Sequence, residues 1–120
     1  MESRPGPSVG ARGEEAALAH YRDHGYRLVA RNWRCSLGEL DLVLTRGSVL
    51  VFCEVKARSG RAYGEPFEAV TWKKQRKLRA LALAFLAVSG RTADSIRFDV
   101  ASVTAGPGRR TSVFVFESAF

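Results

Sequence analysis

The apolar residues of the chain recur at two different spacings, which separate predicted helices from predicted strands. Spacing of three and four residues predicts helices at 13–24 and 67–88, the first with Ala17, Leu18 and Tyr21 on one face. Short apolar runs predict five strands, at 26–33, 39–45, 49–56, 96–103 and 112–117. The expected order is αβββαββ, an α+β pattern with a mixed sheet.

Glycine-containing breaks set the connections between these segments. Arg46-Gly47-Ser48 is short enough to be a hairpin turn, so the second and third strands are expected to be antiparallel neighbours. Gly60, Gly64 and Pro66 predict a loop at 57–66. The last strand is expected at an edge of the sheet. We expect one domain at 13–120, preceded by a flexible tail at 1–12.

Charge changes this picture more than composition does. The 120 residues include 19 Lys and Arg against 12 Asp and Glu, a net charge of +7. Such a small basic domain suggests a polyanionic partner, nucleic acid first and an anionic membrane surface second, although a merely cationic surface is the plain alternative. No apolar run is long enough to cross a bilayer. Neither a signal segment nor a zinc-binding cysteine spacing is present, so a cytoplasmic protein is expected.

Three charged residues interrupt strands that are otherwise apolar enough to be buried. Asp41 lies on the second predicted strand, and Glu54 and Lys56 lie near the end of the third. Burying such charges is costly unless they pair with one another or hold a metal ion. Because side chains two positions apart point the same way, Glu39 shares a face with Asp41, and Glu54 shares one with Lys56.

The hairpin register decides whether Asp41 and Glu54 converge. If they do, a divalent cation removes the repulsion between the two carboxylates, and oxygen ligands suit a hard ion such as Mg²⁺ or Mn²⁺. Lys56 would then position an attacking water or stabilise charge on a phosphate, which favours metal-assisted phosphodiester hydrolysis. A cross-strand ion pair on a solvated face is the structural alternative.

Cations crowd the first half of the long predicted helix, at Lys73, Lys74, Arg76, Lys77 and Arg79. A solvated helix face explains such residues in general. Here no acid compensates them, and their density favours contacts with phosphates, which position a nucleic acid without reading its sequence.

The predicted loop at 57–66 carries Arg58, Arg61 and Tyr63. These residues could clamp a nucleic-acid strand, with Tyr63 stacking on a base, or simply be solvated. The two tryptophans, Trp33 and Trp72, are predicted to be packing residues rather than platforms for bases. Asp99, within an apolar strand, is predicted to accept structural hydrogen bonds.

A series of short motifs resembles, in order, the YraN-like family of small uncharacterised bacterial proteins. The resemblance extends from about residue 10 to residue 104. The motifs are Gly13-Glu14, Gly25-Tyr26, Arg31-Asn32-Trp33-Arg34, Gly38-Glu39-Leu40-Asp41-Leu42, Val51-Phe52-Cys53-Glu54-Val55-Lys56-Ala57-Arg58, Tyr63-Gly64-Glu65-Pro66, Glu68-Ala69-Val70, Lys74-Gln75 and Arg97-Phe98-Asp99-Val100.

That family is similar to the PD-(D/E)xK nuclease superfamily, near the archaeal Holliday junction resolvases. The resemblance implies a restriction-endonuclease-like core, in which helices flank a mixed sheet. It implies that Asp41 and Glu54 bind metal, that Lys56 is the lysine of the motif, and that Glu14 completes the metal site. Gln75 matches a helix position near the site. Leu40 stands where the name-giving proline would be, but proline binds no metal.

The expected function is therefore Mg²⁺-dependent or Mn²⁺-dependent hydrolysis of structured or branched DNA, with Asp41, Glu54 and Lys56 as catalytic residues. Two alternatives stand beside it. One is a non-catalytic nucleic-acid-binding module that retains the fold, and the other is a protein-interaction module. A homodimer would fit the two symmetric cuts that a four-way junction presents.

Overall fold

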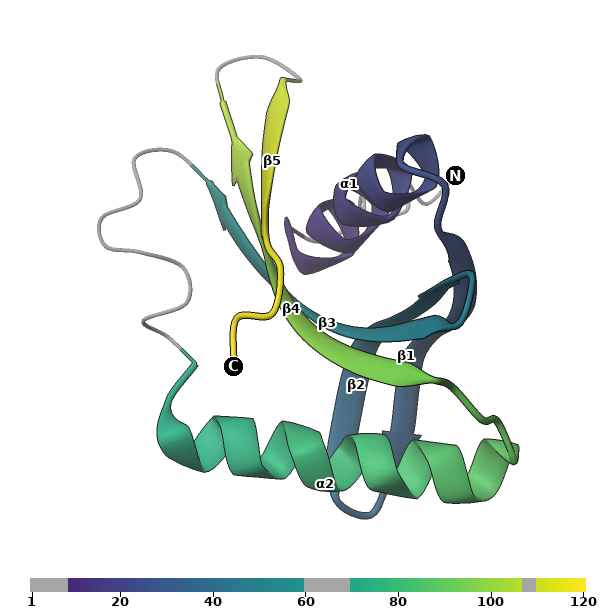
Figure 1. The fold of residues 1–120 in the computed structure, drawn as a ribbon. Helices are drawn as coiled ribbons and strands as arrows, with labels where there is room; N and C mark the ends of the chain where they lie inside the picture. Colours follow the sequence, from purple (N-terminus) through teal and green to yellow (C-terminus); the bar gives the residue numbers. More distant parts are fainter. Residues whose placement is uncertain (1–8, 60–69, 107–109) are drawn as a thin grey trace, which may run out of the picture.

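The computed structural model describes residues 9–59, 70–106 and 110–120 of the chain. Within these ranges, two helices and five strands follow one another in the predicted order αβββαββ (Figure 1). Their bounds are α1 (Val9–Asp23), β1 (Arg27–Cys35), β2 (Gly38–Arg46), β3 (Val49–Ser59), α2 (Trp72–Ser89), β4 (Ser95–Ala105) and β5 (Thr111–Phe116).

The strands form one mixed sheet in the order β1-β2-β3-β4-β5. Strands β1, β2 and β3 are antiparallel neighbours, as the predicted hairpin turn requires. Strands β3 and β4 run parallel, and α2 lies between them in the chain because parallel neighbours need a long crossover. Strand β5 pairs antiparallel with β4 at the edge of the sheet, as predicted. The α+β prediction is confirmed, and the arrangement is consistent with a restriction-endonuclease-like core.

The helices cover opposite faces of the sheet, and each face has its own apolar core (Figure 1). Side chains of β2 and β3 alternate between the two layers, which is why both strands are apolar along most of their length. The α1 layer includes Ala17, Leu18, Tyr21, Leu42, Leu44, Val51 and Cys53. The α2 layer includes Val43, Leu50, Phe52, Leu78, Leu81 and Phe85.

Both helices begin at positions that differ from the predicted ones. Helix α1 starts at Val9, so residues 9–12 form its first turn instead of belonging to the tail, and residues 1–8 lie outside the described ranges. Helix α2 starts only at Trp72, because the Thr71 side chain accepts a hydrogen bond from the Lys74 N–H at 3.2 Å and caps the helix. Gly90, with φ of 68°, ends it in the left-handed conformation.

Asp99 connects three parts of the fold. Its fully buried carboxylate accepts hydrogen bonds from the Tyr21 hydroxyl of α1 and from the Arg97 guanidinium, each at 2.8 Å. The backbone N–H of Ser118, just after β5, donates to it at 3.1 Å. The prediction of a structural role for Asp99 is confirmed. Burial raises the pKa of Tyr21, so its hydroxyl stays a donor in this network.

Candidate metal centre

Asp41 lies where β2 separates from β3. The pairing of the two strands reaches Leu42 opposite Cys53 and goes no further in this direction, although β3 continues to Ser59 beside β4. Beyond that point the Asp41 Oδ2 accepts a hydrogen bond from the Val55 N–H at 2.8 Å. The carboxylate thus takes the place that a backbone carbonyl of β2 would hold in a continuous ladder.

The hairpin of β1 and β2 also bends at this level. Regular alternation would send Leu40 into the same layer as Leu42, yet Leu40 packs with Val43 in the α2 layer. On β1, Asn32 has φ of 53°, in the left-handed region, between the residues that pair with Leu40 and Leu42. One such residue turns the strand locally, and Asp41 lies beside that turn.

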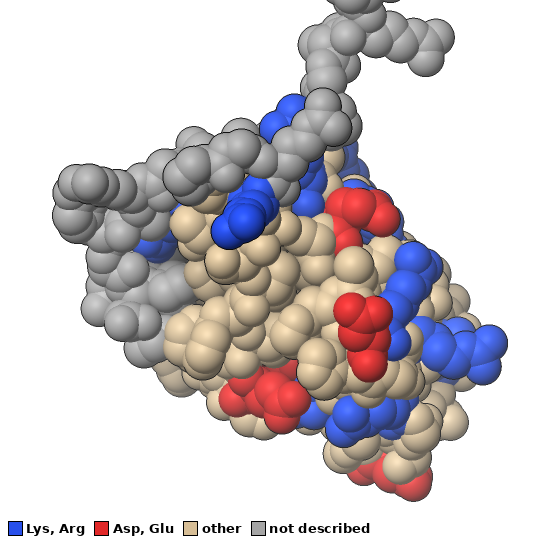
Figure 2. Space-filling view, turned by 90° about the horizontal axis from the view of Figure 1, so that it is seen from above, with Lys and Arg blue, Asp and Glu red and all other residues tan. Residues whose placement is uncertain are grey.

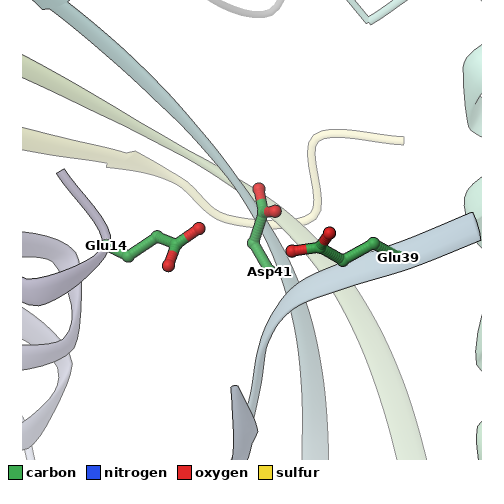
Figure 3. A group of neighbouring side chains, drawn as sticks. All are labelled: Glu14, Glu39 and Asp41. Carbon is green, nitrogen blue, oxygen red and sulfur yellow. The ribbon is translucent and has the colours of Figure 1, made fainter. Parts of the chain in front are cut away.

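Three carboxylates converge around Asp41. One oxygen each of Glu14, Glu39 and Asp41 lies within 4.8 Å of the others. Glu14 comes from α1 and Glu39 from β2, and Figure 3 shows both carboxylates pointing toward Asp41 from opposite sides. An all-oxygen, all-carboxylate donor set fits a hard divalent cation such as Mg²⁺ or Mn²⁺. Glu39 shares the face of Asp41, as the strand spacing predicts.

Glu54 lies on β3 between two lysines. Its Oε1 is 3.6 Å from the Lys56 Nζ and 2.7 Å from the Lys74 Nζ of α2. Only 10% of the Glu54 side chain is exposed, against 22% for Lys56 and 36% for Lys74. Glu54 and Lys56 share a face, as predicted, and contact each other within β3. This contact differs from the structural alternative, which was a cross-strand ion pair on a solvated face.

The surroundings of the site shift the pKa values of its charged groups. Burial raises the pKa of Asp41 to about 7, the negative charge of Glu54 adds to this shift, and the Val55 N–H opposes it. Burial, and then Lys74, lower the pKa of Lys56. Burial also disfavours the charged form of Lys74, but Glu54 outweighs it and raises the pKa of Lys74. The setting of Asp41 therefore disfavours its negative charge in the absence of a cation.

Arginines of β1 neutralise the outer carboxylates. Arg31 donates through Nε to Glu14 at 3.3 Å and through Nη1 to Glu15 at 2.7 Å. Arg34 donates to Glu39 at 2.9 Å. These pairs hold Glu14 and Glu39 beside Asp41 and compensate part of their charge.

A hollow of about 270 Å³ opens between β2, β3 and α2 over this site. It is lined by Glu39, Asp41, Glu54, Lys74, Lys77, Leu78 and Leu81. A larger hollow, of about 440 Å³, lies between α2 and β4 and contains none of the clustered carboxylates. The smaller hollow is the one that joins acids and lysines, so we take it as the candidate site.

Most of the residues singled out in the sequence can be placed. Asp41 is linked to Glu14 by the carboxylate cluster and to Glu54 by the hollow, and Lys56 contacts Glu54. The side chain of Gln75 does not line the hollow: its Nε2 donates to the Val70 carbonyl at 3.1 Å.

The cations of the predicted DNA contacts divide into three groups. Lys74 and Lys77 line the hollow, while Lys73 is exposed on the outer side of α2. Arg58 lies in β3, because that strand continues to Ser59 instead of ending before a loop at 57. Arg61 and Tyr63, like the rest of the predicted loop after Ser59, lie outside the described residues.

The contact between Lys74 and Glu54 was not foreseen in the sequence. A signal was available, because Lys74 precedes Leu78 by four residues and Leu81 by seven, a spacing that places it on the buried stripe of α2. The ion pairs of Arg31 had no comparable signal. They depend on how α1 packs beside β1.

The two tryptophans behave differently. Trp33 packs edge-on against Phe85, with 5.3 Å between ring centroids, as predicted for a packing residue. The same prediction was wrong for Trp72, which is 72% exposed. As the first residue of α2, Trp72 lies on the helix side opposite the core stripe.

The distribution of charge on the surface is mixed where it can be seen. On the face shown in Figure 2, Lys and Arg side chains lie beside Asp and Glu side chains, with uncharged atoms between them. Helix α2, which covers the face of the sheet opposite α1 in Figure 1, has five Lys and Arg and no Asp or Glu. Within the described ranges, no helix is both long and apolar enough to span a membrane.

Comparison with known proteins gives a consistent family assignment. Residues 13–103 match the model of the uncharacterised protein family UPF0102. A UPF0102 protein of Symbiobacterium thermophilum is 48% identical over 112 residues, which cover 93% of this chain and 95% of that protein. One from Nocardia farcinica is 45% identical over 113 residues, covering 94% of this chain and 89% of the relative. One from Rhodococcus jostii is 43% identical, with coverage of 94% and 96%.

Proposed function

The chain belongs to the UPF0102 family, and from that premise we propose that it is a divalent-metal-dependent nuclease. The substrate class is structured or branched DNA, as for a Holliday junction resolvase. One observation carries the proposal: Asp41 joins the carboxylates of Glu14 and Glu39 to a hollow that also contains Glu54, with Lys56 against Glu54. This is the residue set that phosphodiester hydrolysis with a hard cation requires.

Each residue of the site has its own role in this proposal. A bound Mg²⁺ or Mn²⁺ would supply Lewis-acid stabilisation of the phosphate and an acidic water. Asp41 and Glu14 would hold the cation, Glu54 would orient it from β3, and Glu39 would add an oxygen on the side of β2. Lys56 positions the water or stabilises the charge that develops on the phosphate. Leu78 and Leu81 form the apolar part of the lining of the hollow.

Helix α2 supports nucleic acid as the partner. Lys73, Lys74 and Arg76 lie in or next to its first turn, at the positive end of the helix dipole, where cations are unfavourable for stability. Lys74 is compensated by Glu54, whereas Lys73 and Arg76 form no ion pair with a described residue, so an anionic partner such as a phosphate would offset their cost. A homodimer would present two such surfaces to the two halves of a four-way junction.

The test is cleavage of labelled four-way junction, flap and single-stranded DNA with Mg²⁺ or Mn²⁺. Asp41→Asn and Glu54→Gln keep the side-chain shapes and are expected to lower the cleavage rate by about 100-fold or more. Glu15→Gln is the matched control, because Glu15 is next to Glu14 but 64% exposed and outside the cluster. Cleavage unchanged in both site variants would overturn the proposal.

A specific observation favours a second candidate, a nucleic-acid-binding module without catalysis. Lys74 at 2.7 Å from Glu54 and Arg31 at 3.3 Å from Glu14 neutralise two of the proposed metal ligands. This candidate predicts salt-dependent DNA binding, no cleavage, and no change in thermal stability when Mn²⁺ is added. An increase in melting temperature with Mn²⁺ that Asp41→Asn abolishes would decide for the metal site.

A further inference from the structure

Trp72 is an exposed aromatic residue that does not belong to the candidate metal site. It is 72% exposed, more than the next most exposed large aromatic residue of the described chain, Phe114, at 61%. A single exposed apolar residue is ordinary. Its setting is less ordinary, since the indole stands at the start of α2, the helix that contributes Lys74 and Lys77 to the candidate site.

Two exposed cations lie near Trp72 on α2. Arg76, four positions further along, is on the same side of the helix as the indole, and Lys73 is the neighbour of Trp72 in the chain. Neither forms an ion pair with a described residue. Among the described side chains, no aromatic ring or guanidinium stacks on the Trp72 ring. A flat aromatic face beside uncompensated cations is complementary to a nucleobase with its phosphates.

The indole lies at the same end of α2 as the candidate site, on the other side of the helix. Lys74, two residues after Trp72, contacts Glu54 at 2.7 Å, and Lys77, one turn further, lines the hollow. Lys73 lies on the helix surface between the indole and Lys77. Because one helical turn rises only about 5.4 Å, Trp72 and the hollow are separated by the width of the helix and not by its length.

We propose that Trp72 is a stacking platform for an unpaired base of the nucleic acid, with Lys73 and Arg76 contacting the adjoining phosphates. The inference rests on the proposed function and makes it more specific: the partner has single-stranded nucleotides next to the site, as a flap or a branch point does. Bases paired within a regular duplex are stacked on each other and do not offer a face to the indole. Trp72 therefore discriminates between single-stranded and duplex DNA.

The experiment measures binding in EDTA, so that cleavage does not enter. Fluorescence anisotropy compares a thymine oligonucleotide, an abasic strand of the same length and a blunt duplex, each with wild type, Trp72→Leu and Trp72→Phe. Trp72→Leu is expected to weaken binding of the thymine strand by about 5-fold to 100-fold. Binding of the abasic strand and of the duplex should change by less than about 2-fold, and Trp72→Phe should retain most of the affinity.

Val88→Ala provides the matched control, since Val88 is also exposed, at 75%, on the same helix, and has Ala84 and Phe85 instead of cations one turn before it. It should leave all three affinities unchanged. Equal affinities of wild type and Trp72→Leu for the thymine strand would overturn the inference, as would a parallel loss for the abasic strand. So would a buried-indole emission spectrum of Trp72, obtained by subtracting Trp72→Phe from wild type. If the wild-type protein discriminates between these ligands but cleaves no DNA, the proposed nuclease activity is wrong and the role of Trp72 stands.

Discussion

At the scale of single residues, Asp41 carries the main conflict between stability and function. It accepts a backbone hydrogen bond from Val55, which favours its charged form. Burial and the nearby Glu54 oppose that form more strongly. Such a carboxyl group lowers the stability of the fold at neutral pH, and sites that bind cations are where this loss is found.

Asp41→Asn is expected to stabilise the metal-free protein at pH 8. The pKa of Asp41 is about 7 in the folded protein, against an ordinary value of 3.8. The folded state thus holds this proton more tightly than the unfolded state, and the stability from it is full below pH 3.8 and lost as the pH rises through 7. Without the titrating group, the variant should gain about 1 to 3 kcal/mol at pH 8 and less at pH 5.

Urea denaturation at the two pH values, in EDTA, measures this difference. Asp23→Asn serves as the control, because it makes the same substitution at an exposed position of α1 outside the carboxylate cluster. An Asp41→Asn protein that is less stable than wild type at pH 8 would contradict the raised pKa.

At the scale of elements, the site depends on close packing between α1 and β3. A Cβ at Gly13 would lie 2.5 Å from the Ala57 Cβ, so only glycine permits this approach of helix to strand. The next residue, Glu14, is the one that α1 contributes to the carboxylate cluster. The distance between α1 and the sheet therefore sets the position of Glu14.

Gly13→Ala is expected to destabilise the protein by about 1 to 3 kcal/mol, because α1 must move away from β3. This occurs although alanine is the better helix former. Gly10→Ala, at an exposed position of the same helix, should instead stabilise it by up to about 1 kcal/mol. Thermal denaturation of the two variants gives the comparison. Equal effects of the two substitutions would show that packing at Gly13 does not decide the position of α1.

The bent hairpin is the second element-scale feature. Strand β2 leaves β3 at Asp41, and the left-handed Asn32 on β1 lies at the same level. Because of this separation, the Asp41 carboxylate and not a carbonyl group reaches the Val55 N–H. The bend therefore brings Asp41 of β2 beside the backbone of β3.

At the scale of the whole molecule, the +7 charge is arranged unevenly. Helix α2 has no acid, whereas two arginines of β1, Arg31 and Arg34, are paired with acids. Long-range attraction of a polyanion is therefore directed to the α2 side of the sheet.

Neutralising the outer cations of α2 should change how nucleic-acid binding depends on salt. Each of Lys73→Gln and Arg76→Gln is expected to reduce the slope of log affinity against log salt concentration by about 1. Arg22→Gln, an exposed cation of α1, should leave the slope unchanged. Titrations of a labelled strand at several salt concentrations measure it. An equal reduction for Arg22→Gln would indicate a diffuse effect of net charge without a defined surface.

Much of the fold could be predicted because local patterns decide it. The alternation of Leu42, Val43 and Leu44 suits a strand buried on both faces, and a short glycine turn at 46–48 leaves an antiparallel neighbour as the simple outcome. Helix starts were less predictable. The Thr71 cap competes with apolar spacing that continues upstream, and the cap decides where α2 begins.

The candidate site was predictable to the extent that it follows strand alternation. Glu39 with Asp41 and Glu54 with Lys56 share faces because of the period of two. Lys74 on Glu54 and Arg31 on Glu14 join residues 20 and 17 positions apart, and no local pattern encodes such contacts. The exposure of Trp72 is of the same kind, since a tryptophan within a predicted helix looks like a packing residue in the sequence.

The sequence by itself determined the order of elements, the α+β class, the faces of the strands and the charged residues that are costly to bury. These properties depend on neighbours along the chain. The tertiary structure decided which acids meet, where β2 separates from β3, which cation pairs with Glu54 and where Trp72 points. Those properties depend on helix placement across the sheet, which long-range packing sets and no short segment contains.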